Sequence, residues 1–279
     1  MNRSSTSVAV LGLGIIGSRV AGHLERAGYP TVRWSRTGRM AGGCRSPKEA
    51  AEKALTIQMF LRDDEAVLDA VRSMAPALGK DHIVLNHATI SKPATLEVAS
   101  ICQPQGAGFL DAPFTGSKMA AENAKLCYYV GGNKKTLEEV RHVLEVSSAK
   151  ILHLGEVGDA MVLKIATNLV TSVTVKALSE ACAIAQAEGI PMEALKVAFE
   201  ANANCSPLIS MKLAAIQGGD FSAHFSLINM LKDVDFALQL ASESKIKASA
   251  ASCTAEALRK GLELGKGEDD FSVIAQINE

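Results

Sequence analysis

The stretch that decides the fold is VAVLGLGIIG, which runs from Val8 to Gly17. Four apolar residues, typical of a buried strand, lead directly into a G-x-G-x-x-G turn, and helical periodicity follows over residues 15–27. The first glycine, Gly12, permits the tight turn. Gly14 lets the backbone approach a pyrophosphate, and Gly17 lets the helix pack closely on the strand. The sequence therefore predicts a dinucleotide site at the amino end of this helix, where free N–H groups favour an anion.

Outward from this turn, short apolar runs alternate with amphipathic segments. The runs predict strands over residues 8–11, 31–34, 55–61, 83–86, 108–110, 125–131 and 150–154. The segments between them predict helices over residues 15–27, 47–53, 63–74, 92–102 and 136–146, with Asp63 and Ser91 as N-caps. This alternation is typical of a parallel sheet with helices on both faces. We therefore predict an α/β domain over residues 1–157, a Rossmann-type doubly wound parallel sheet.

The pattern becomes wholly helical from residue 158. Small and apolar residues recur at helical spacing from Ala160 to Ala185, which predicts one long interdomain helix ending before Pro191. Further helices are predicted over residues 192–201, 208–217, 228–244 and 248–264. We therefore predict an all-helical domain over residues 158–279, which begins with this long interdomain helix.

Composition narrows the class of protein. Of 279 residues, 48% are hydrophobic and 21% charged, and the net charge is −1, so no basic stripe for nucleic acid is visible. The polar amino terminus lacks a signal-type core, and no uninterrupted apolar run approaches the ~18 residues of a membrane span. The cysteines are scattered singly, and His82 and His87 are badly spaced for a shared metal. We expect a soluble, cytoplasmic protein with reduced cysteines, no metal, and no membrane or nucleic-acid partner.

The residues after the second predicted strand choose between the two nicotinamide dinucleotides. An NAD site usually has Asp or Glu there, to bind the ribose 2′-hydroxyl. This chain has Trp34-Ser35-Arg36-Thr37, without a carboxylate. The Arg36 guanidinium could bind a 2′-phosphate and stack on adenine, with Ser35 and Thr37 as further donors. A solvated surface arginine is the alternative, but the pattern favours NADP (NADPH) over NAD.

Three later segments form a recognisable set: DAPFTGS at residues 111–117, GEVGDAMVLK at residues 155–164 with Asn168 beyond it, and Lys232-Asp233. Together with the glycine turn, in this order and over nearly the whole chain, they resemble the β-hydroxyacid dehydrogenase family. That family includes 3-hydroxyisobutyrate dehydrogenase, tartronate semialdehyde reductase and glyoxylate/succinic semialdehyde reductase. One departure is Ala160, where many members have glycine.

The resemblance implies that Lys164 is the catalytic residue. The residues agree, because Lys164 lies in a small, apolar helical segment where a charged side chain is costly to bury. Its ammonium would protonate the alkoxide during reduction, and the neutral amine would accept the hydroxyl proton during oxidation. Asn168, four residues on, shares its helix face and would hold the substrate. A lysine that reaches solvent and an asparagine that only packs are the alternatives.

The resemblance also assigns the substrate contacts. Family members bind the substrate carboxylate through a Ser/Thr-Gly segment, here Thr115-Gly116, in which Thr115 keeps the hydroxyl of the more usual serine. Ser117-Lys118 follows, where hydroxyisobutyrate-type members usually carry a second glycine. That dipeptide is more similar to the glyoxylate/succinic semialdehyde reductase group. Thr89 would meet both nicotinamide and substrate, with an ordinary helix-start hydroxyl as the alternative.

Three residues of the helical half complete the implied site. Phe225 would form a pocket wall, although a core phenylalanine is nearly as good a reading. Lys232 would reach the cofactor, and Asp233 would orient Lys164 or anchor the pocket. Adjacent helix residues do not face each other, so we expect Lys232 and Asp233 to have separate partners, with a solvated helix of ion pairs as the alternative for both. The predicted substrate contacts are Thr89, Thr115, Gly116, Asn168, Phe225 and Asp233, and the predicted cofactor contacts are Gly12, Leu13, Gly14, Ile15, Ile16, Gly17, Ser35, Arg36, Thr37, Leu61, Thr89 and Lys232.

These inferences predict an NADPH-dependent reductase of a small aldehyde acid, with Lys164 as the general acid. The alternatives are a 3-hydroxyisobutyrate or tartronate semialdehyde type of dehydrogenase, and a non-catalytic dinucleotide-binding module. A module of that kind tends to lose the lysine, and imine reductases generally lack it. The Ala-rich helical half is too apolar to be covered by so few helices, and related enzymes are dimers or tetramers. We therefore expect a homodimer or homotetramer.

Overall fold

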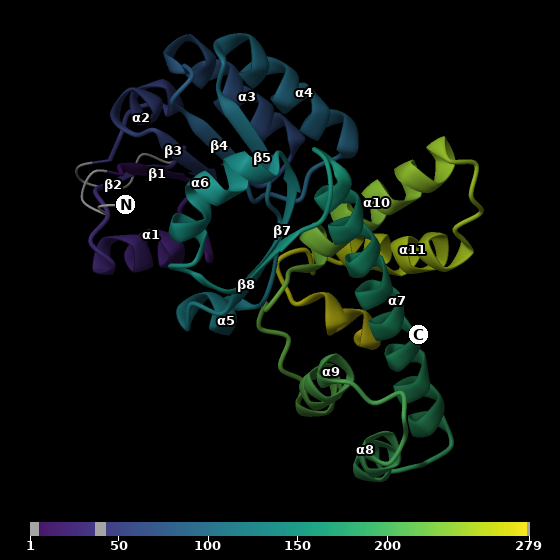
Figure 1. Ribbon diagram of the computed structural model, residues 1–279. Helices are drawn as coiled ribbons and strands as arrows, with labels where there is room; N and C mark the ends of the chain where they lie inside the picture. The colour runs from purple at the N-terminus through teal and green to yellow at the C-terminus, as the bar shows by residue number, and fades with distance from the viewer. Residues whose placement is uncertain (1–5, 37–42, 278–279) are drawn as a thin grey trace. The chain divides into compact units, whose positions relative to one another are not determined.

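The chain forms two compact units in a computed structural model that describes residues 6–36 and 43–277. The units are Met1–Lys164 and Ile165–Glu279, and the division falls inside the long helix α7, Asp159–Ala187. The sequence pattern predicts the domain boundary after residue 157, just before this helix begins. Figure 1 shows the first unit as a sheet with helices and the second as helices. The predicted fold class, a Rossmann-type domain followed by helices, is confirmed.

The core of the first unit is a parallel sheet. Its strands are β1 (Val8–Leu11), β2 (Thr31–Trp34), β3 (Thr56–Met59), β4 (Ile83–Asn86) and β5 (Gly108–Asp111), in the order β2-β1-β3-β4-β5. Every neighbouring pair among these five is parallel, as predicted. The order reverses at β1, whose two neighbours are β2 and β3. Ligands of open α/β sheets bind beyond the carboxyl ends of the strands at such a reversal.

The remaining strands make the sheet mixed, which corrects the expectation of a wholly parallel one. After β5 the chain forms the short strand β6 (Phe114–Thr115) and the short helix α5 (Lys118–Glu122), and returns as β7 (Leu126–Gly132). β7 is antiparallel to both β5 and β6. Parallel strands are usually joined by a crossover helix, and the segment between β5 and β7 has only the five-residue helix α5. The helix α6 (Lys134–Leu144) supplies one, and β8 (Ser148–His153) is parallel to β7.

Several helices of the first unit begin where the local sequence provides a cap. The helices α2 (Pro47–Lys53), α3 (Asp64–Met74), α4 (Lys92–Cys102) and α6 begin after Ser46, Asp63, Ser91 and Asn133, whose side chains accept backbone N–H groups. The predicted caps Asp63 and Ser91 are thereby confirmed. The helix α1 (Gly17–Arg26) has no side-chain cap. Short 3₁₀ turns, η2 (Ala75–Ala77) and η3 (Gln103–Gln105), follow α3 and α4. The buried core around the sheet includes Val8, Val10, Leu24, Leu85, Leu110, Leu126 and Tyr128.

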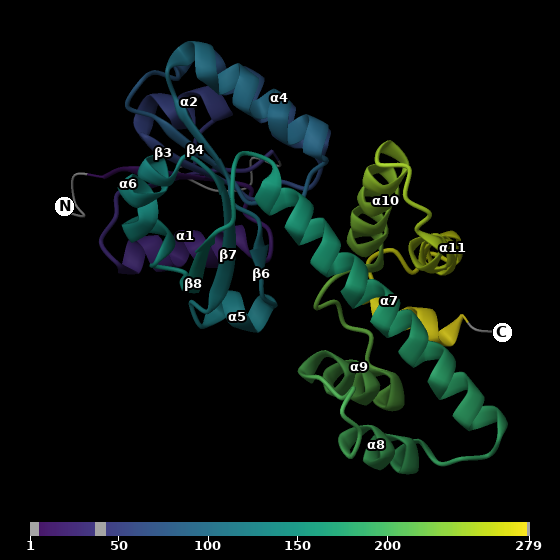
Figure 2. The ribbon, with the colours of Figure 1, turned by 45° about the vertical axis from the view of Figure 1, so that its right-hand side comes forward.

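The second unit is helical within the described residues. After α7 come α8 (Met192–Glu200), α9 (Pro207–Gly218), α10 (Leu227–Glu243), α11 (Ser249–Glu263) and the 3₁₀ turn η4 (Phe271–Gln276). Figure 2 shows α10 packed beside α11, and α8 beside α9. One buried cluster joins α10, α11 and η4 to Val175 of α7, and a smaller one joins α7 to α9 through Leu178, Cys182, Ile209 and Leu213.

The long helix α7 is more apolar than its burial within this chain explains. Among the described residues it is the one helix that length and composition would allow to cross a membrane. Only 33% of its most apolar 18-residue window is buried. Val170 and Ile184 are each 66% exposed. Core helices of soluble proteins can have the same length and composition, so these properties do not place α7 in a membrane. They show that α7 has an exposed apolar face.

Candidate active site

The predicted site segments leave the sheet at one edge. The strand register aligns the last residue of β1, Leu11, with Trp34 of β2 and with Met59 of β3. It continues the row through Asn86 of β4 to Asp111 of β5. The glycine turn and the loops that begin at residues 35, 60, 87 and 112 therefore all start along the carboxyl edge. This edge brings together segments that lie far apart in the sequence.

The glycine turn has the geometry that its sequence requires. Gly12 has φ +91°, and a Cβ there would lie 2.2 Å from the Phe60 carbonyl oxygen. A Cβ on Gly17 would lie 2.0 Å from the Gly12 carbonyl oxygen, so the helix could not approach the strand. A Cβ on Gly14, by contrast, would meet no protein atom within 4 Å. The open side of Gly14 and the uncapped amino end of α1 fit a pyrophosphate.

The flanking cofactor candidates lie around this turn. Leu13 and Ile16 pack partly against the core, whereas Ile15 is exposed. Leu61 touches the turn, because its Cδ2 atom lies 3.2 Å from the position of a Gly12 Cβ. Ser35 is half-buried and Arg36 exposed directly after β2, and Thr37 lies outside the described residues. The arrangement fits a dinucleotide whose adenosine end lies beyond β2. The individual contacts stay predictions.

The loop after β4 holds Thr89 in a fixed backbone. The Asn86 side chain accepts the Ala88 N–H at 3.2 Å and donates to the Ala88 carbonyl at 3.1 Å. The Ile90 N–H donates to the sulfur of Met161 at 3.4 Å. Thr89, half-buried between these two anchors, therefore lies beside the first turns of α7.

The β6–β7 hairpin places Thr115 opposite Cys127, whose thiol is influenced by the charge of Lys164. Thr115 of β6 pairs with Cys127 of β7 in the strand register, and opposed residues of antiparallel strands share a face. Burial raises the pKa of the Cys127 thiol, while the positive charges of Lys150 and Lys164 act in the opposite direction. Lys164 is 9% exposed, which is low for a lysine. The Cys127 thiol thus has Thr115 opposite it in the strand register and is influenced by the charge of Lys164, and Gly116, next to Thr115, has φ +135°.

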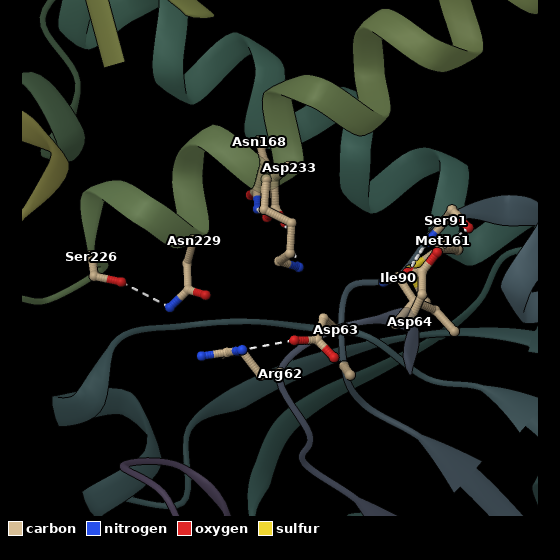
Figure 3. A network of polar contacts seen from close by, with 12 residues as sticks. Arg62, Asp63, Asp64, Ile90, Ser91, Met161, Asn168, Ser226, Asn229 and Asp233 are labelled. Atoms are coloured by element: carbon tan, nitrogen blue, oxygen red, sulfur yellow. Dashed lines mark hydrogen bonds and ion pairs between the residues drawn. The ribbon is translucent and has the colours of Figure 1, made fainter. Parts of the chain in front are cut away.

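A second polar group lies in the helical unit. The Asn168 amide donates to a carboxylate oxygen of Asp233 at 2.6 Å, and both side chains are buried (Figure 3). The other Asp233 oxygen lies 3.0 Å from the Lys232 ammonium. Asp233 therefore accepts from Asn168, a residue of the same helix face as Lys164. The site roles of Asn168 and Asp233 stay predictions.

The expectation of separate partners for Lys232 and Asp233 is wrong. Their Cβ atoms diverge on α10, but the four-carbon lysine stem is long enough to return its ammonium to the neighbouring carboxylate. Lys232 is still 21% exposed along its side chain, and its ammonium lies 5.1 Å from the centre of the Phe236 ring. Phe225 is half-buried and packs edge-on against Phe271, with ring centres 6.3 Å apart. Phe225 thus packs against the core of the helical unit, and its role as a pocket wall stays a prediction.

Four residues of this region were not singled out from the sequence. Cys127 and Arg62 flank the predicted site, and the Arg62 guanidinium donates to Asp63 at 3.0 Å (Figure 3). Asp111 and Met161 contact the first turn of α7 and the loops around it. The register of β6 with β7 reveals Cys127, and no periodicity could have set that register in advance. Asp111 is the first residue of the DAPFTGS segment, so the sequence indicated its position near the site but not its hydrogen bonds with Gly158 and Met161.

The chain matches known families and proteins over nearly its whole length. Residues 7–155 match the family model described as the NAD binding domain of 6-phosphogluconate dehydrogenase. Residues 158–277 match the model described as NAD-binding of NADP-dependent 3-hydroxyisobutyrate dehydrogenase. Together the two models cover both the sheet unit and the helical unit.

Individual relatives are similar at low identity and high coverage. Glyoxylate/succinic semialdehyde reductase 1 of Arabidopsis thaliana is 27% identical, over 96% of this chain and 97% of its own length. A probable 3-hydroxyisobutyrate dehydrogenase of Mycobacterium bovis is 29% identical over 96% of each chain. The structure of Mycobacterium tuberculosis 3-hydroxyisobutyrate dehydrogenase with L-serine has a TM-score of 0.89, at 25% identity and 98% coverage of each chain.

Proposed function

Because this chain belongs to the β-hydroxyacid dehydrogenase family and is an NAD(P)-dependent oxidoreductase, we propose that it is an NADPH-dependent reductase of a small aldehyde acid. The proposed substrate is of the glyoxylate or succinic semialdehyde type. The similarity to the Arabidopsis thaliana reductase and the Ser117-Lys118 dipeptide both support this choice.

The observation that carries the proposal is the burial of Lys164, a lysine whose positive charge acts on the Cys127 thiol of β7. A bound nicotinamide supplies the hydride that reduces the aldehyde carbon. Lys164 then donates a proton to the developing alkoxide oxygen, and the hydroxyl of Thr115 with the backbone at Gly116 holds the substrate carboxylate. Asp233 fixes the Asn168 amide, so that the Asn168 side chain lies in one orientation on the helix face of Lys164.

The choice of NADPH rests on Arg36 and on the missing carboxylate after β2. A charge-assisted contact to a 2′-phosphate contributes roughly 1.5–3 kcal/mol. We therefore expect Arg36→Ala to weaken NADPH binding by about ten- to a hundredfold and to leave NADH binding within about twofold. Isothermal titration with both cofactors checks this. Equal affinity of the wild-type protein for NADH and NADPH would contradict the assignment.

A steady-state panel tests the substrate. Glyoxylate, succinic semialdehyde, tartronate semialdehyde and 3-hydroxyisobutyrate are compared at saturating cofactor, in the reducing or oxidising direction that each allows. The proposal expects the highest kcat/KM for glyoxylate or succinic semialdehyde with NADPH. A higher kcat/KM for 3-hydroxyisobutyrate would overturn it.

A 3-hydroxyisobutyrate-type dehydrogenase is the second candidate. It is favoured by the 29% identical Mycobacterium bovis relative and by the Mycobacterium tuberculosis structure with L-serine, itself a small hydroxy acid. A non-catalytic dinucleotide-binding module is the third, and the retained Lys164 argues against it. Cofactor binding without turnover of any panel substrate would favour that module.

We also propose that the protein is a cytoplasmic homodimer or homotetramer, without membrane or nucleic-acid partners. The exposed apolar face of α7 supports packing between copies, because exposed apolar area of this kind commonly marks an interface. Light scattering at micromolar concentration checks the oligomer. A monomer would contradict it.

A further inference from the structure

The first turn of α7 is anchored by a side chain from the sheet. Asp111, the last residue of β5, is completely buried. One of its carboxylate oxygens accepts the Gly158 N–H at 3.0 Å, and the other accepts the Met161 N–H at 3.0 Å. These donors lie 47 and 50 residues further along the chain. Asp111 therefore caps α7 from another element.

The surroundings are shaped to admit this carboxylate. A Cβ on Gly131 of β7 would lie 2.5 Å from an Asp111 oxygen and 2.5 Å from the Glu156 carbonyl oxygen. Only a glycine at position 131 leaves room for both groups. The local caps Ser46, Asp63 and Ser91 each hold the helix that directly follows them. Asp111 differs, because it fixes the distance between the sheet edge and α7.

Met161 extends the anchor to a second loop. Its backbone N–H is bound by Asp111, and its buried sulfur accepts the N–H of Ile90, the residue after Thr89. Thr115 lies four residues beyond Asp111, and Lys164 lies three residues beyond Met161. The loops that carry the two substrate hydroxyls and the helix that carries the ammonium thus meet at Asp111 and Met161.

We propose that Asp111 and Met161 are positioning residues that set the place of the Lys164 ammonium relative to Thr89 and Thr115. This proposal rests on the proposed function. Met161 and Lys164 lie in one continuous helix, so loss of either anchor would displace Lys164 as well. A misplacement of about 1 Å can lower a rate about a hundredfold, whereas cofactor binding at the glycine turn does not depend on this distance.

Two substitutions test the proposal, each with a matched control. Asp111→Asn keeps the size of the side chain but leaves one of the two N–H groups facing an NH₂ donor. Met161→Leu removes the sulfur acceptor with little change of volume. The controls are Asp63→Asn, at the local cap of α3, and Met74→Leu, at a buried position of the same helix.

The kinetic readouts at pH 8 separate positioning from stability. We expect kcat to fall about ten- to a hundredfold in Asp111→Asn and about three- to tenfold in Met161→Leu. NADPH Kd and substrate KM should stay within about threefold, and the solvent deuterium isotope effect on kcat should rise because proton transfer becomes slower. The controls should keep wild-type kcat within about twofold. Should Asp111→Asn fail to fold, Met161→Leu decides.

Hydrogen exchange over residues 158–164 gives a readout that needs no turnover. Exchange should be about tenfold or more faster in both variants and unchanged in both controls. Wild-type kcat with an unaltered isotope effect in folded variants would overturn the positioning role. The positioning role would also be overturned if the fall in kcat were no larger than the fall in the folded fraction, as measured by circular dichroism. The wild-type protein could reduce no aldehyde of the panel while the two variants still show faster exchange over residues 158–164. That result would overturn the proposed function and leave the anchoring of α7 intact.

Discussion

Asp111 in the sheet unit and Asp270 in the helical unit are both buried, yet their carboxyl groups are shifted in opposite directions. Burial raises the pKa of Asp111 to about 6, despite the hydrogen bonds from Gly158 and Met161. Burial would raise the pKa of Asp270 too, but the Lys212 ammonium at 2.6 Å and the Ser272 hydroxyl hold it below its ordinary value. Asp270 accepts more hydrogen bonds than Asp111, and one of its donors is an ammonium, so its ionised form is favoured despite burial.

The two carboxylates also do different work. Asp270 binds Lys212 of α9 and accepts the N–H groups of His224 and Phe225, so it ties the last described turn to the segment before α10. Asp270 therefore stabilises the packing of these segments. Asp111 is bound by N–H groups of the helix that carries Lys164, and its burial is unfavourable when it is ionised. The buried Asp111 carboxylate thus lowers the stability of the fold, and such a loss is expected at a site where the position of a functional group matters more than stability.

The largest effect should come from breaking the Lys212–Asp270 pair. Lys212→Met would leave the buried Asp270 carboxylate without its cation, which typically destabilises a protein by about 3–5 kcal/mol. Urea unfolding at pH 7 followed by circular dichroism measures this. Arg259→Met, which removes an exposed pair with Asp235, is the control and should change stability by about 1 kcal/mol or less. A loss below 1 kcal/mol in Lys212→Met would break the comparison.

His87 extends the rule to a base. It is completely enclosed, its ring N–H donates to the Ala112 carbonyl at 2.7 Å, and burial lowers its pKa to about 4. The unfolded chain takes up this proton near pH 6.5 and the folded chain does not, so stability is lost as the pH falls. Relative to His87→Gln, the wild-type protein should lose about 2 kcal/mol of unfolding free energy between pH 7 and 5. A flat difference curve would show that the His87 ring has the same pKa in the folded and unfolded chains.

Asp111 should give a smaller change of opposite sign. Its folded pKa is raised, so between pH 6 and 3.8 the folded chain holds a proton that the unfolded chain releases. Stability of the wild-type protein relative to Asp111→Asn should therefore increase by about 1 kcal/mol from pH 7 to 5. The same urea titrations measure it. A decrease on acidification would mean that the two N–H groups outweigh the burial of the charge.

The sequence predicts local features well and long-range contacts poorly. VAVLGLGIIG gives a strand, a turn and a helix because each choice there is dictated by neighbouring residues. The caps Asp63 and Ser91 are equally local. The pairing of β7 with β5, the register of Thr115 with Cys127 and the bonds from Asp111 to α7 depend on how distant segments pack. The Lys232–Asp233 ion pair depends on a flexible stem that helix geometry alone does not place.

The candidate site divides in the same way. The glycine turn and the carboxyl-edge loops follow from parallel strand pairing, which the βα alternation predicts, whereas the strand order comes from the structure. Lys164 and Asn168 follow from helical spacing together with the family resemblance, and the structure adds their burial and the Asp233 partner. Arg36 and Phe225 stay predictions, since neither a phosphate nor a substrate is present to contact them.

The kcat of Lys164→Ala with glyoxylate and succinic semialdehyde, measured beside its NADPH Kd, tests the central claim most directly. Lys176→Ala, an ion-paired lysine further along α7, is the matched control. If Lys164 is the proton donor, kcat falls by at least about a hundredfold while NADPH Kd stays within about threefold, and the control remains near wild type. A Lys164→Ala variant that turns over either aldehyde at a near wild-type rate would contradict the account.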